Sequence, residues 1–276
     1  MLAGSIRILR PVNGLISSLT VWISFIISGG GYAEYSGILA SIAAFFFAGF
    51  ANSVNDIEDI DIDRINKPHR PLPSGRINKK TAIMVAILSG LIALGISFIL
   101  TVFTAIIGII AVAGMLLYNL RLKRIAFWGN TTVSLIAAVA FIYGGAANNN
   151  IFPALFPALM AFLLHLGREV TKDIEDVRGD SAVGARTLPL VRGLALTRNV
   201  ASIPLMILIP VTLLPMYFDM YSYAYLIMVT PVNIILLLVI YNLLISRRLS
   251  AKRNSLLLKV AMPLGIMAIL FGTIIP

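Results

Sequence analysis

Long apolar runs alternate with short polar segments along the whole chain. A membrane-spanning helix needs about 20 mostly apolar residues. Nine runs reach this length, at approximately residues 11–29, 37–55, 82–101, 103–120, 130–148, 151–171, 199–217, 221–244 and 256–275. The pattern therefore predicts an all-α, polytopic membrane protein, with nine transmembrane helices forming a single domain over residues 1–276.

The composition supports the membrane class and excludes several kinds of functional site. Hydrophobic residues make up 59% of the chain and charged residues only 12%, whereas soluble domains carry about 25% charged residues. The absence of cysteine excludes disulfides, thiolate nucleophiles, iron–sulfur clusters and cysteine-ligated zinc. The first apolar run does not have the pattern of a cleavable signal peptide, so we interpret it as a retained helix.

The positive charges are distributed asymmetrically. All 22 lysines and arginines lie at the N-terminus or in or beside the longer polar connections, and the short connections carry none. The positive-inside rule then places the N-terminus and the longer loops in the cytoplasm, and an odd helix count places the C-terminus outside. A basic group near the last helix is expected to anchor the chain to anionic lipid head groups: Arg247, Arg248, Lys252 and Arg253.

Two acidic segments follow long apolar runs and resemble each other. Residues 56–63 read Asp-Ile-Glu-Asp-Ile-Asp-Ile-Asp, and residues 173–180 read Asp-Ile-Glu-Asp-Val-Arg-Gly-Asp. The three aspartates that they share keep a constant offset of 117 positions. Carboxylates at a membrane helix end are unfavourable unless they are paired or bind a cation, so both segments are candidate functional sites.

Helical spacing gathers the polar side chains of each segment on one face. On the first face lie Asn52, Asn55, Asp56, Asp59 and Asp63, while Glu58 and Asp61 point the other way. On the second lie Glu169, Lys172, Asp173, Asp176 and Asp180, with His165 one turn further back. We interpret His165 as a hydrogen-bonded interior residue.

The spacing of the two segments also predicts a repeat. The second and sixth predicted helices are four apart, so they run parallel and end at the same membrane surface. We therefore expect parallel repeats over residues 11–120 and 130–244, followed by a final helix at 256–275, with the two acidic faces meeting across a central cavity.

Facing carboxylates repel each other in a low-dielectric site. Mg²⁺ prefers oxygen ligands and is commonly held by one or two carboxylates together with substrate phosphates. The two segments therefore point to magnesium bound to an anionic diphosphate. Salt bridges to the many nearby arginines and lysines are the alternative, and the duplication favours the metal.

These motifs resemble those of a known enzyme family. Asn55-Asp-x-x-Asp59-x-x-x-Asp63, followed by Arg70-Pro-Leu-Pro-Ser-Gly, is similar to the first signature of the UbiA superfamily of intramembrane prenyltransferases. Asp173-x-x-Asp176-x-x-x-Asp180 is similar to the second. Within the superfamily, the segment from residue 168 to 189 most resembles the archaeal digeranylgeranylglyceryl phosphate synthases.

The resemblance implies a nine-helix bundle around a central cavity that opens to lipid, and Mg²⁺ dependence. It implies transfer of a geranylgeranyl group from geranylgeranyl diphosphate to the free glycerol hydroxyl of geranylgeranylglyceryl phosphate, which forms an ether and releases diphosphate. The metal ligands that it implies are Asn55, Asp59, Asp63, Asp176 and Asp180, with Asp56 and Asp173 close by.

Several residues outside the metal ligands are candidates for substrate contacts. Arg10 lies at phosphate depth with Asn13 one turn inward, and Arg70 is able to bind diphosphate in a bidentate manner. Arg168 and Lys172 are also suited to phosphate. For Arg10 and the loop containing Arg70, a role as orientation charge is the alternative.

The end of the fourth predicted helix carries two more candidates. Tyr118 and Lys123 lie in a segment similar to a family segment that contacts diphosphate, which implies a hydroxyl donor and a leaving-group ligand. Without the resemblance they are an interfacial aromatic and a snorkelling anchor. The predicted catalytic residues are therefore these two together with four aspartates: Tyr118, Lys123, Asp59, Asp63, Asp176 and Asp180.

Two other functions remain open. A related enzyme with an aromatic acceptor, making a quinone or pigment precursor, shares the same motifs. A divalent-cation or lipid transporter is more distant, because few polar residues continue beyond the inner third of the helices. The partners that we expect are prenyl diphosphate, a lipid phosphate and membrane lipids, with no nucleic acid and no obligate protein partner.

Overall fold

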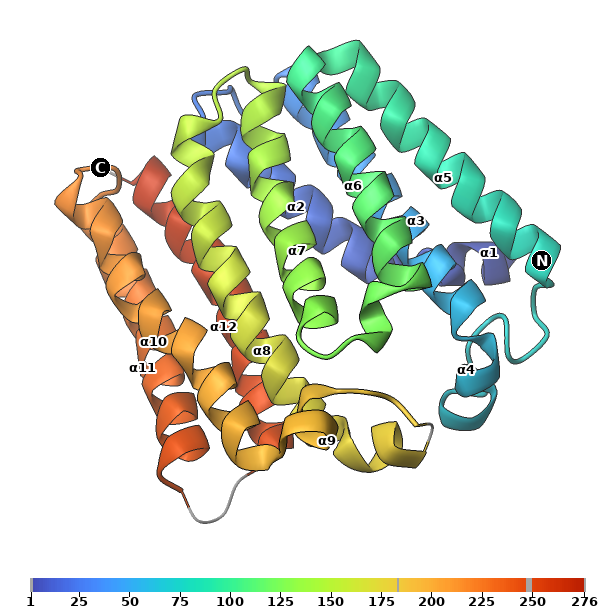
Figure 1. Cartoon of the computed structure of the whole chain (residues 1–276). Coiled ribbons are helices and arrows are strands. Elements are labelled where there is room, and N and C mark those ends of the chain that lie inside the picture. The colour runs from blue at the N-terminus through green and yellow to red at the C-terminus, as the bar shows by residue number, and fades with distance from the viewer. Residues whose placement is uncertain (1, 183, 247–249, 276) are drawn as a thin grey trace. The chain divides into compact units, whose positions relative to one another are not determined.

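The computed structural model describes residues 2–182, 184–246 and 250–275, and within these ranges the regular structure is helical, with no strand (Figure 1). The all-α prediction is confirmed. Each predicted apolar run lies in a helix: α2 (Pro11–Ile27), α3 (Tyr35–Glu58), α5 (Lys79–Leu100), α6 (Val102–Leu120), α7 (Trp128–Ala147), α8 (Leu155–Ala182), α10 (Leu194–Tyr217), α11 (Tyr223–Leu244) and α12 (Ala251–Ile274).

The polytopic membrane class is confirmed as well. Among the described residues, eight helices are long and apolar enough to cross a membrane, and α2, with 17 residues, is shorter. The count of nine therefore depends on α2 and stays a prediction. Many large apolar side chains of these helices are exposed, which fits a surface that faces lipid; examples on α5 are Ile83, Met84, Ile87, Leu88 and Leu91.

The hydropathy pattern did not predict the shorter helices or some helix ends. Three short α-helices and two 3₁₀ helices occupy the connections: α1 (Leu2–Ile8), α4 (Ile60–Asn66), α9 (Leu188–Arg192), η1 (Leu122–Arg124) and η2 (Phe152–Ala154). In addition, α3 and α8 continue past their apolar runs into the acidic segments, because the backbone hydrogen bonds of a helix do not depend on side-chain polarity. Arg247 and Arg248 lie outside the described residues.

The first of two compact units comprises residues 1–121 and 139–154. In it α3 packs against α2, α5 and α6. The helices approach closely at small residues: a Cβ on Gly37 would lie 2.6 Å from Phe25, and a Cβ on Gly144 would lie 2.6 Å from Ser24. Such packing of small residues is typical of membrane helices, where burial of apolar surface does not drive association.

The second unit comprises residues 122–138 and 155–276. In it α8 packs against α10 and α12, and α11 packs against the same two helices. Tyr225 of α11 is fully buried, and its hydroxyl donates a hydrogen bond to the carbonyl oxygen of Thr212 at 2.7 Å. Each unit carries one acidic motif: residues 52–63 form the first motif and residues 173–180 the second.

Candidate active site

The first motif spans the joint between two helices. Helix α3 ends at Glu58 and α4 begins at Ile60, so Asp59 occupies the joint, with φ −95° and ψ 10°. The backbone hydrogen bonds nevertheless continue, from Asp59 N to Asn55 O at 3.0 Å and from Asp63 N to Asp59 O at 2.7 Å. Because the helical register is kept across the joint, Asn55, Asp59 and Asp63 lie on successive turns.

The acids of the first motif separate into buried and exposed faces. Asp56 and Asp63 are 1% and 3% exposed, whereas Glu58 and Asp61 are exposed. This agrees with the faces predicted from helical spacing. A buried carboxylate is unfavourable unless it is paired, so the partners of Asp56 and Asp63 decide what this face is able to bind.

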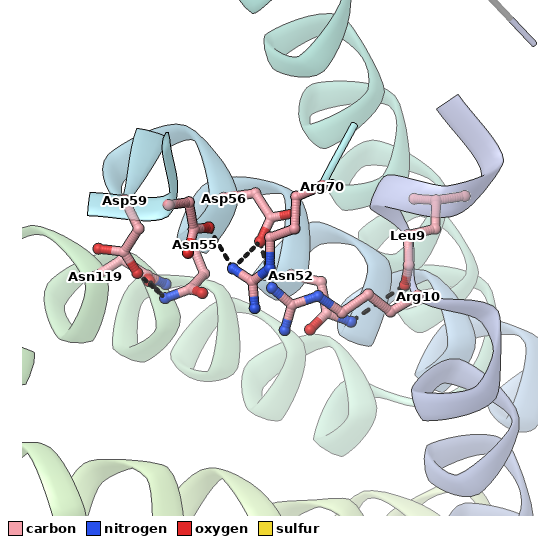
Figure 2. A network of polar contacts seen from close by, with 9 residues as sticks. Leu9, Arg10, Asn52, Asn55, Asp56, Asp59, Arg70 and Asn119 are labelled. Carbon is pink, nitrogen blue, oxygen red and sulfur yellow. Dashed lines mark hydrogen bonds and ion pairs between the residues drawn. The ribbon is translucent and has the colours of Figure 1, made fainter. Parts of the chain in front are cut away.

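Two arginines meet at the buried carboxylates. Nη1 of Arg70 lies 3.1 Å from Oδ1 of Asp56 and also forms an ion pair with Oδ2 of Asp63. Nη2 of Arg10 donates to the same Asp56 oxygen (Figure 2). For these two acids the structure shows the salt bridges that the sequence left open as an alternative, and their role as magnesium ligands stays a prediction.

Local backbone geometry brings Arg10 to this site. Arg10 precedes α2 with φ 51° and ψ 70°, in the left-handed region that residues other than glycine rarely adopt, and Pro11 starts the helix. Its N–H donates to the carbonyl oxygen of Arg7 at 3.1 Å, which closes a turn between α1 and α2. Strained backbone of this kind persists only where the surroundings hold it, and such residues cluster at functional sites.

A second set of contacts in the first motif involves amides. Nδ2 of Asn55 donates to Oδ2 of Asp59 at 3.1 Å and to Oδ1 of Asn119 at 3.2 Å (Figure 2). Asn119, in the last turn of α6, is 3% exposed and donates to the carbonyl oxygen of Met115. Because the amide nitrogen of Asn55 makes both bonds, its carbonyl oxygen is left for another partner. Sequence analysis missed Asn119, although a lone asparagine in an apolar helix was the available signal.

The other predicted residues of the first unit lie near the same elements. Asn13 is exposed on α2, and Tyr118 is partly exposed beside Asn119 at the end of α6. In the second unit, Lys123 is partly exposed in η1. Nothing in the structure tests the roles assigned to these three side chains, so they stay predictions.

The second motif lies within one uninterrupted helix, α8. Oδ2 of Asp173 accepts a hydrogen bond from Nδ2 of Asn130, at the start of α7, at 2.8 Å. Asp173 and Asp180 are partly exposed and Asp176 is exposed. Within the described residues these three aspartates form no ion pair. Asn130 is a second partner that sequence analysis missed.

The two candidate basic residues of α8 differ in exposure and in ion pairing. Lys172 is exposed, whereas Arg168 is partly buried and forms an ion pair with Glu169. Nε of Arg168 is buried and has no hydrogen-bond partner in the part of the chain that the structure describes. A buried donor without a partner is a place for a water or an anionic ligand, which is consistent with the predicted phosphate contact. His165 is partly exposed one turn before Glu169.

The donor chemistry of the two motifs suits magnesium. The predicted ligands offer only amide and carboxylate oxygens: Asn55, Asp59, Asp63, Asp176 and Asp180. Over residues 2–182, 184–246 and 250–275, no three acidic or histidine side chains form a metal-binding group by themselves. Magnesium often takes only one or two carboxylates and completes its shell with water and phosphate oxygens, so the residues present fit this ion when a diphosphate is bound.

Comparison with known proteins identifies the family. The model of the UbiA prenyltransferase family matches residues 17–262. The chain belongs to the UbiA prenyltransferase family. It is therefore a multi-pass membrane enzyme that transfers prenyl groups, and this decides against the transporter alternative.

Curated relatives place the chain within the family. It is 33% identical over 270 residues to the digeranylgeranylglyceryl phosphate synthase of Methanothermobacter thermautotrophicus, covering 97% of this chain and 95% of that one. It is 32% identical to the synthase of the same name from Saccharolobus solfataricus, with coverages of 97% and 96%. The chain is thus most similar to the archaeal digeranylgeranylglyceryl phosphate synthases.

Solved structures agree with this placement. A structure from work on digeranylgeranylglyceryl phosphate synthase in membranes matches with a TM-score of 0.87 and 29% identity, covering 99% of this chain and 98% of that one. A UbiA homolog from Archaeoglobus fulgidus bound to DMAPP and Mg²⁺ matches with a TM-score of 0.61 and 18% identity, with coverages of 96% and 98%. This second likeness shows the shared fold.

Proposed function

We propose that this enzyme transfers a geranylgeranyl group from geranylgeranyl diphosphate to the free glycerol hydroxyl of geranylgeranylglyceryl phosphate. The observation that carries the proposal is the similarity to synthases of this name along nearly the whole chain, at 33% identity to the Methanothermobacter enzyme. Each half of the chain also contains one complete acidic motif, and together the two motifs supply the carboxylates that we propose to act in the release of diphosphate.

The proposed magnesium ligands are the oxygen donors of the two motifs: Asn55, Asp59, Asp63, Asp176 and Asp180, with Asp56 and Asp173 nearby. When bound, the ion neutralises the diphosphate and stabilises it as a leaving group. Ion-pair geometry supports a division of labour in the first motif. Asp56 holds two guanidinium groups, while the amide nitrogen of Asn55 makes its hydrogen bonds and leaves the carbonyl oxygen of Asn55 suited to a cation.

The proposed substrate residues act on the phosphate oxygens. Arg10 and Arg70 already bind carboxylates in the first unit, and a diphosphate likewise presents pairs of anionic oxygens to a planar guanidinium. We expect Arg70 to exchange Asp63 for diphosphate oxygens, which frees that carboxylate. Tyr118 and Asn13 add neutral hydrogen bonds, and three further cations complete the set: Lys123, Arg168 and Lys172.

Proposed chemistry at the reacting carbon depends on excluding water. An allylic cation develops at the first prenyl carbon as the bond to diphosphate breaks, and apolar surroundings protect it from hydrolysis. The glycerol oxygen then forms the new ether bond. Its proton passes to a carboxylate of the second motif or to the released diphosphate.

Two structural proposals accompany the function. The distribution of lysine and arginine supports an N-terminus and an active-site face in the cytoplasm and a C-terminus outside. The constant offset of 117 positions between the motifs supports an internal repeat over residues 11–120 and 130–244 within one domain. Labelling of single cysteines introduced near each terminus, from either side of sealed vesicles, tests the orientation.

A direct assay of the purified enzyme tests the function. The enzyme in detergent receives geranylgeranyl diphosphate and Mg²⁺ with either geranylgeranylglyceryl phosphate or a hydroxybenzoate, and mass spectrometry identifies the products. We expect the ether lipid only, with an equal amount of diphosphate and no product after chelation of Mg²⁺. A prenylated hydroxybenzoate in place of the ether lipid would refute the proposal and indicate the aromatic-acceptor enzyme.

A further inference from the structure

A basic cavity lies in the first unit beside the first motif. It has a volume of about 370 Å³. Its charged and titratable lining consists of four arginines, one histidine and one carboxylate: Arg7, Arg10, Arg70, Arg76, His69 and Asp56. Arg7, Arg76 and His69 were not among the candidate site residues of the sequence analysis.

A small apolar core holds the walls of this cavity in place. Ile8 of α1, Leu72 and Ile77 of the following loop, and Ala82 of α5 are at most 5% exposed and pack together. A Cβ on Gly4 would lie 2.6 Å from Cγ2 of Ile77, so α1 sits directly on the loop. The basic side chains therefore project from a packed scaffold, and less conformational entropy is lost when they bind a ligand.

Hydrogen bonds inside the loop add to this order. The N–H of Arg70 donates to the carbonyl oxygen of Lys67 at 3.0 Å, and the N–H of Ser74 donates to the carbonyl oxygen of Arg70 at 3.0 Å. The prolines at positions 68, 71 and 73 restrict the backbone further. The guanidinium of Arg70 is thus presented by a constrained turn.

The charge of the cavity is not balanced by the protein. Asp56 serves both Arg10 and Arg70, and Arg70 has a second partner in Asp63. Arg7 and Arg76 are exposed and, among the described residues, neither forms an ion pair. Arg10 and Arg70 are thus paired with two carboxylates and Arg7 and Arg76 are not, so the cavity has an excess of positive charge. An anion with several oxygens is the ligand that satisfies such a group.

The position of the cavity limits which anion it takes. Asp56 forms part of its wall and lies in the same helical turn as Asn55 and Asp59. Asn55, Asp59 and Asp63, the proposed magnesium ligands of the first motif, are therefore near the cavity but do not line it. A group bound there lies beside the reacting diphosphate without depending on the metal for its contacts.

We propose that Arg7 and Arg76 of this cavity bind the phosphate monoester of the acceptor lipid, while Arg10 and Arg70 keep their proposed role toward the diphosphate of the donor; the inference rests on the proposed function. The acceptor has a phosphate on the same three-carbon glycerol as its reacting hydroxyl, so a phosphate site next to the first motif places that hydroxyl near the donor. A phosphate monoester has a charge of about −1.5 to −2 at neutral pH, which matches the charge excess. Guanidinium groups bind such oxygens with defined geometry.

Steady-state kinetics of Arg7→Gln, Arg76→Gln and the double variant test the proposal, with Lys80→Gln as the matched control. Lys80 is exposed at the start of α5 and is not part of the cavity lining. We expect each single variant to raise KM for the acceptor about tenfold, as the loss of one charged hydrogen bond does, with kcat and KM for the donor unchanged. The control keeps all three values.

Two kinetic results would overturn the proposal. A rise in KM for the donor instead of the acceptor would mean that Arg7 and Arg76 also serve the leaving diphosphate. Unchanged kinetics in the double variant would mean that the cavity has no part in binding substrate.

Binding measurements separate this proposal from the proposed function and distinguish the sources of phosphate. Thermal unfolding of wild type and double variant is followed with the acceptor lipid, its dephosphorylated alcohol, phosphatidic acid and inorganic phosphate. We expect stabilisation of wild type by the acceptor only, and loss of this stabilisation in the double variant. If the wild-type enzyme forms no ether while this difference persists, the proposed function fails and the phosphate site stands.

The same unfolding measurements are able to contradict the assignment of the cavity to the acceptor. Equal stabilisation by phosphatidic acid would assign the cavity to membrane lipids, and equal stabilisation by inorganic phosphate would assign it to the free ion. Equal stabilisation by the alcohol would show that the phosphate is not recognised. Each of these results overturns the assignment to the acceptor.

Discussion

The two acidic motifs share their sequence pattern but not their surroundings. Asp56 of the first motif is buried and holds the guanidinium groups of Arg10 and Arg70. Its counterpart Asp173, 117 positions later, is partly exposed and accepts a hydrogen bond from the neutral amide of Asn130. Equivalent aspartates therefore have cationic partners in the first unit and a neutral partner in the second.

The backbone differs as well. The first motif crosses the joint between α3 and α4, whereas the second lies within α8. In the first unit, the turn before α2 and the proline-rich loop supply the arginines, and in the second no ion pair reaches the motif within the described residues. The difference shows that the side chains around a repeated motif decide which ligands the motif is able to bind. We infer that the first motif combines metal binding with anion binding, and that the second mainly binds the cation.

The largest expected effect tests what the two motifs have in common. Asp59→Ala and Asp176→Ala should each reduce turnover by about a thousandfold, because each removes charge stabilisation of the departing diphosphate. The measurement is diphosphate release, with folding checked by size-exclusion chromatography and thermal unfolding. Turnover near the wild-type level in either variant would remove that motif from the catalytic site.

The next effect concerns stability and separates the two motifs. Asp56→Asn removes the buried carboxylate that Arg10 and Arg70 share and should lower stability by about 3 kcal/mol. Asp173→Asn loses only the bond to Asn130 and should lower it by about 1 kcal/mol. Thermal unfolding in detergent measures both, and equal decreases would show that the arginine pairs add nothing to the first motif.

A smaller effect separates residues within the first motif. Asp59→Asn should raise the Mg²⁺ concentration needed for half-maximal binding of prenyl diphosphate by about tenfold, whereas Asp56→Asn should change it less than about twofold. Titration of Mg²⁺ at fixed prenyl diphosphate, followed by isothermal calorimetry, gives both values. Equal shifts would mean that Asp56 ligates the metal and that its arginine pairs give way when the ion binds.

The smallest effect serves as the matched control for both motifs. Glu58 and Glu175 occupy equivalent positions, and both are exposed on the face opposite the shared aspartates. Glu58→Ala and Glu175→Ala should each change turnover by less than about twofold, since substitutions of exposed residues away from the site have small effects. A strong loss in either variant would show that the assignment of faces by helical spacing is incomplete.

Much of the fold was predictable because membrane insertion leaves a direct signal in the chain. Every predicted apolar run lies in a helix, since a segment in lipid must satisfy its backbone hydrogen bonds within itself. The predicted ends were less accurate, as α8 continues to Ala182 beyond the expected end at residue 171. The helix α4 and the joint at Asp59 carry no hydropathy signal, because they lie in a polar segment.

The candidate site was predictable only in part. Helical spacing placed Asp56 and Asp63 on one face and Glu58 on the other, and burial agrees. Spacing along one helix says nothing about side chains that arrive from other helices. Asn119 and Asn130 were therefore missed, and so was the cavity lined by Arg7 and Arg76.

The sequence by itself determined the membrane class and the acidic faces, because hydropathy and helical periodicity are local properties of the chain, and the resemblance of its two motifs to known signatures indicated the family. Only the tertiary structure decided which side chains approach those faces. Arg10 and Arg70 reach Asp56 across 46 and 14 positions of sequence, and their approach depends on how α1, α2 and the loop before α5 pack. Pairing of charges over such separations is a result of packing, and no local pattern encodes it.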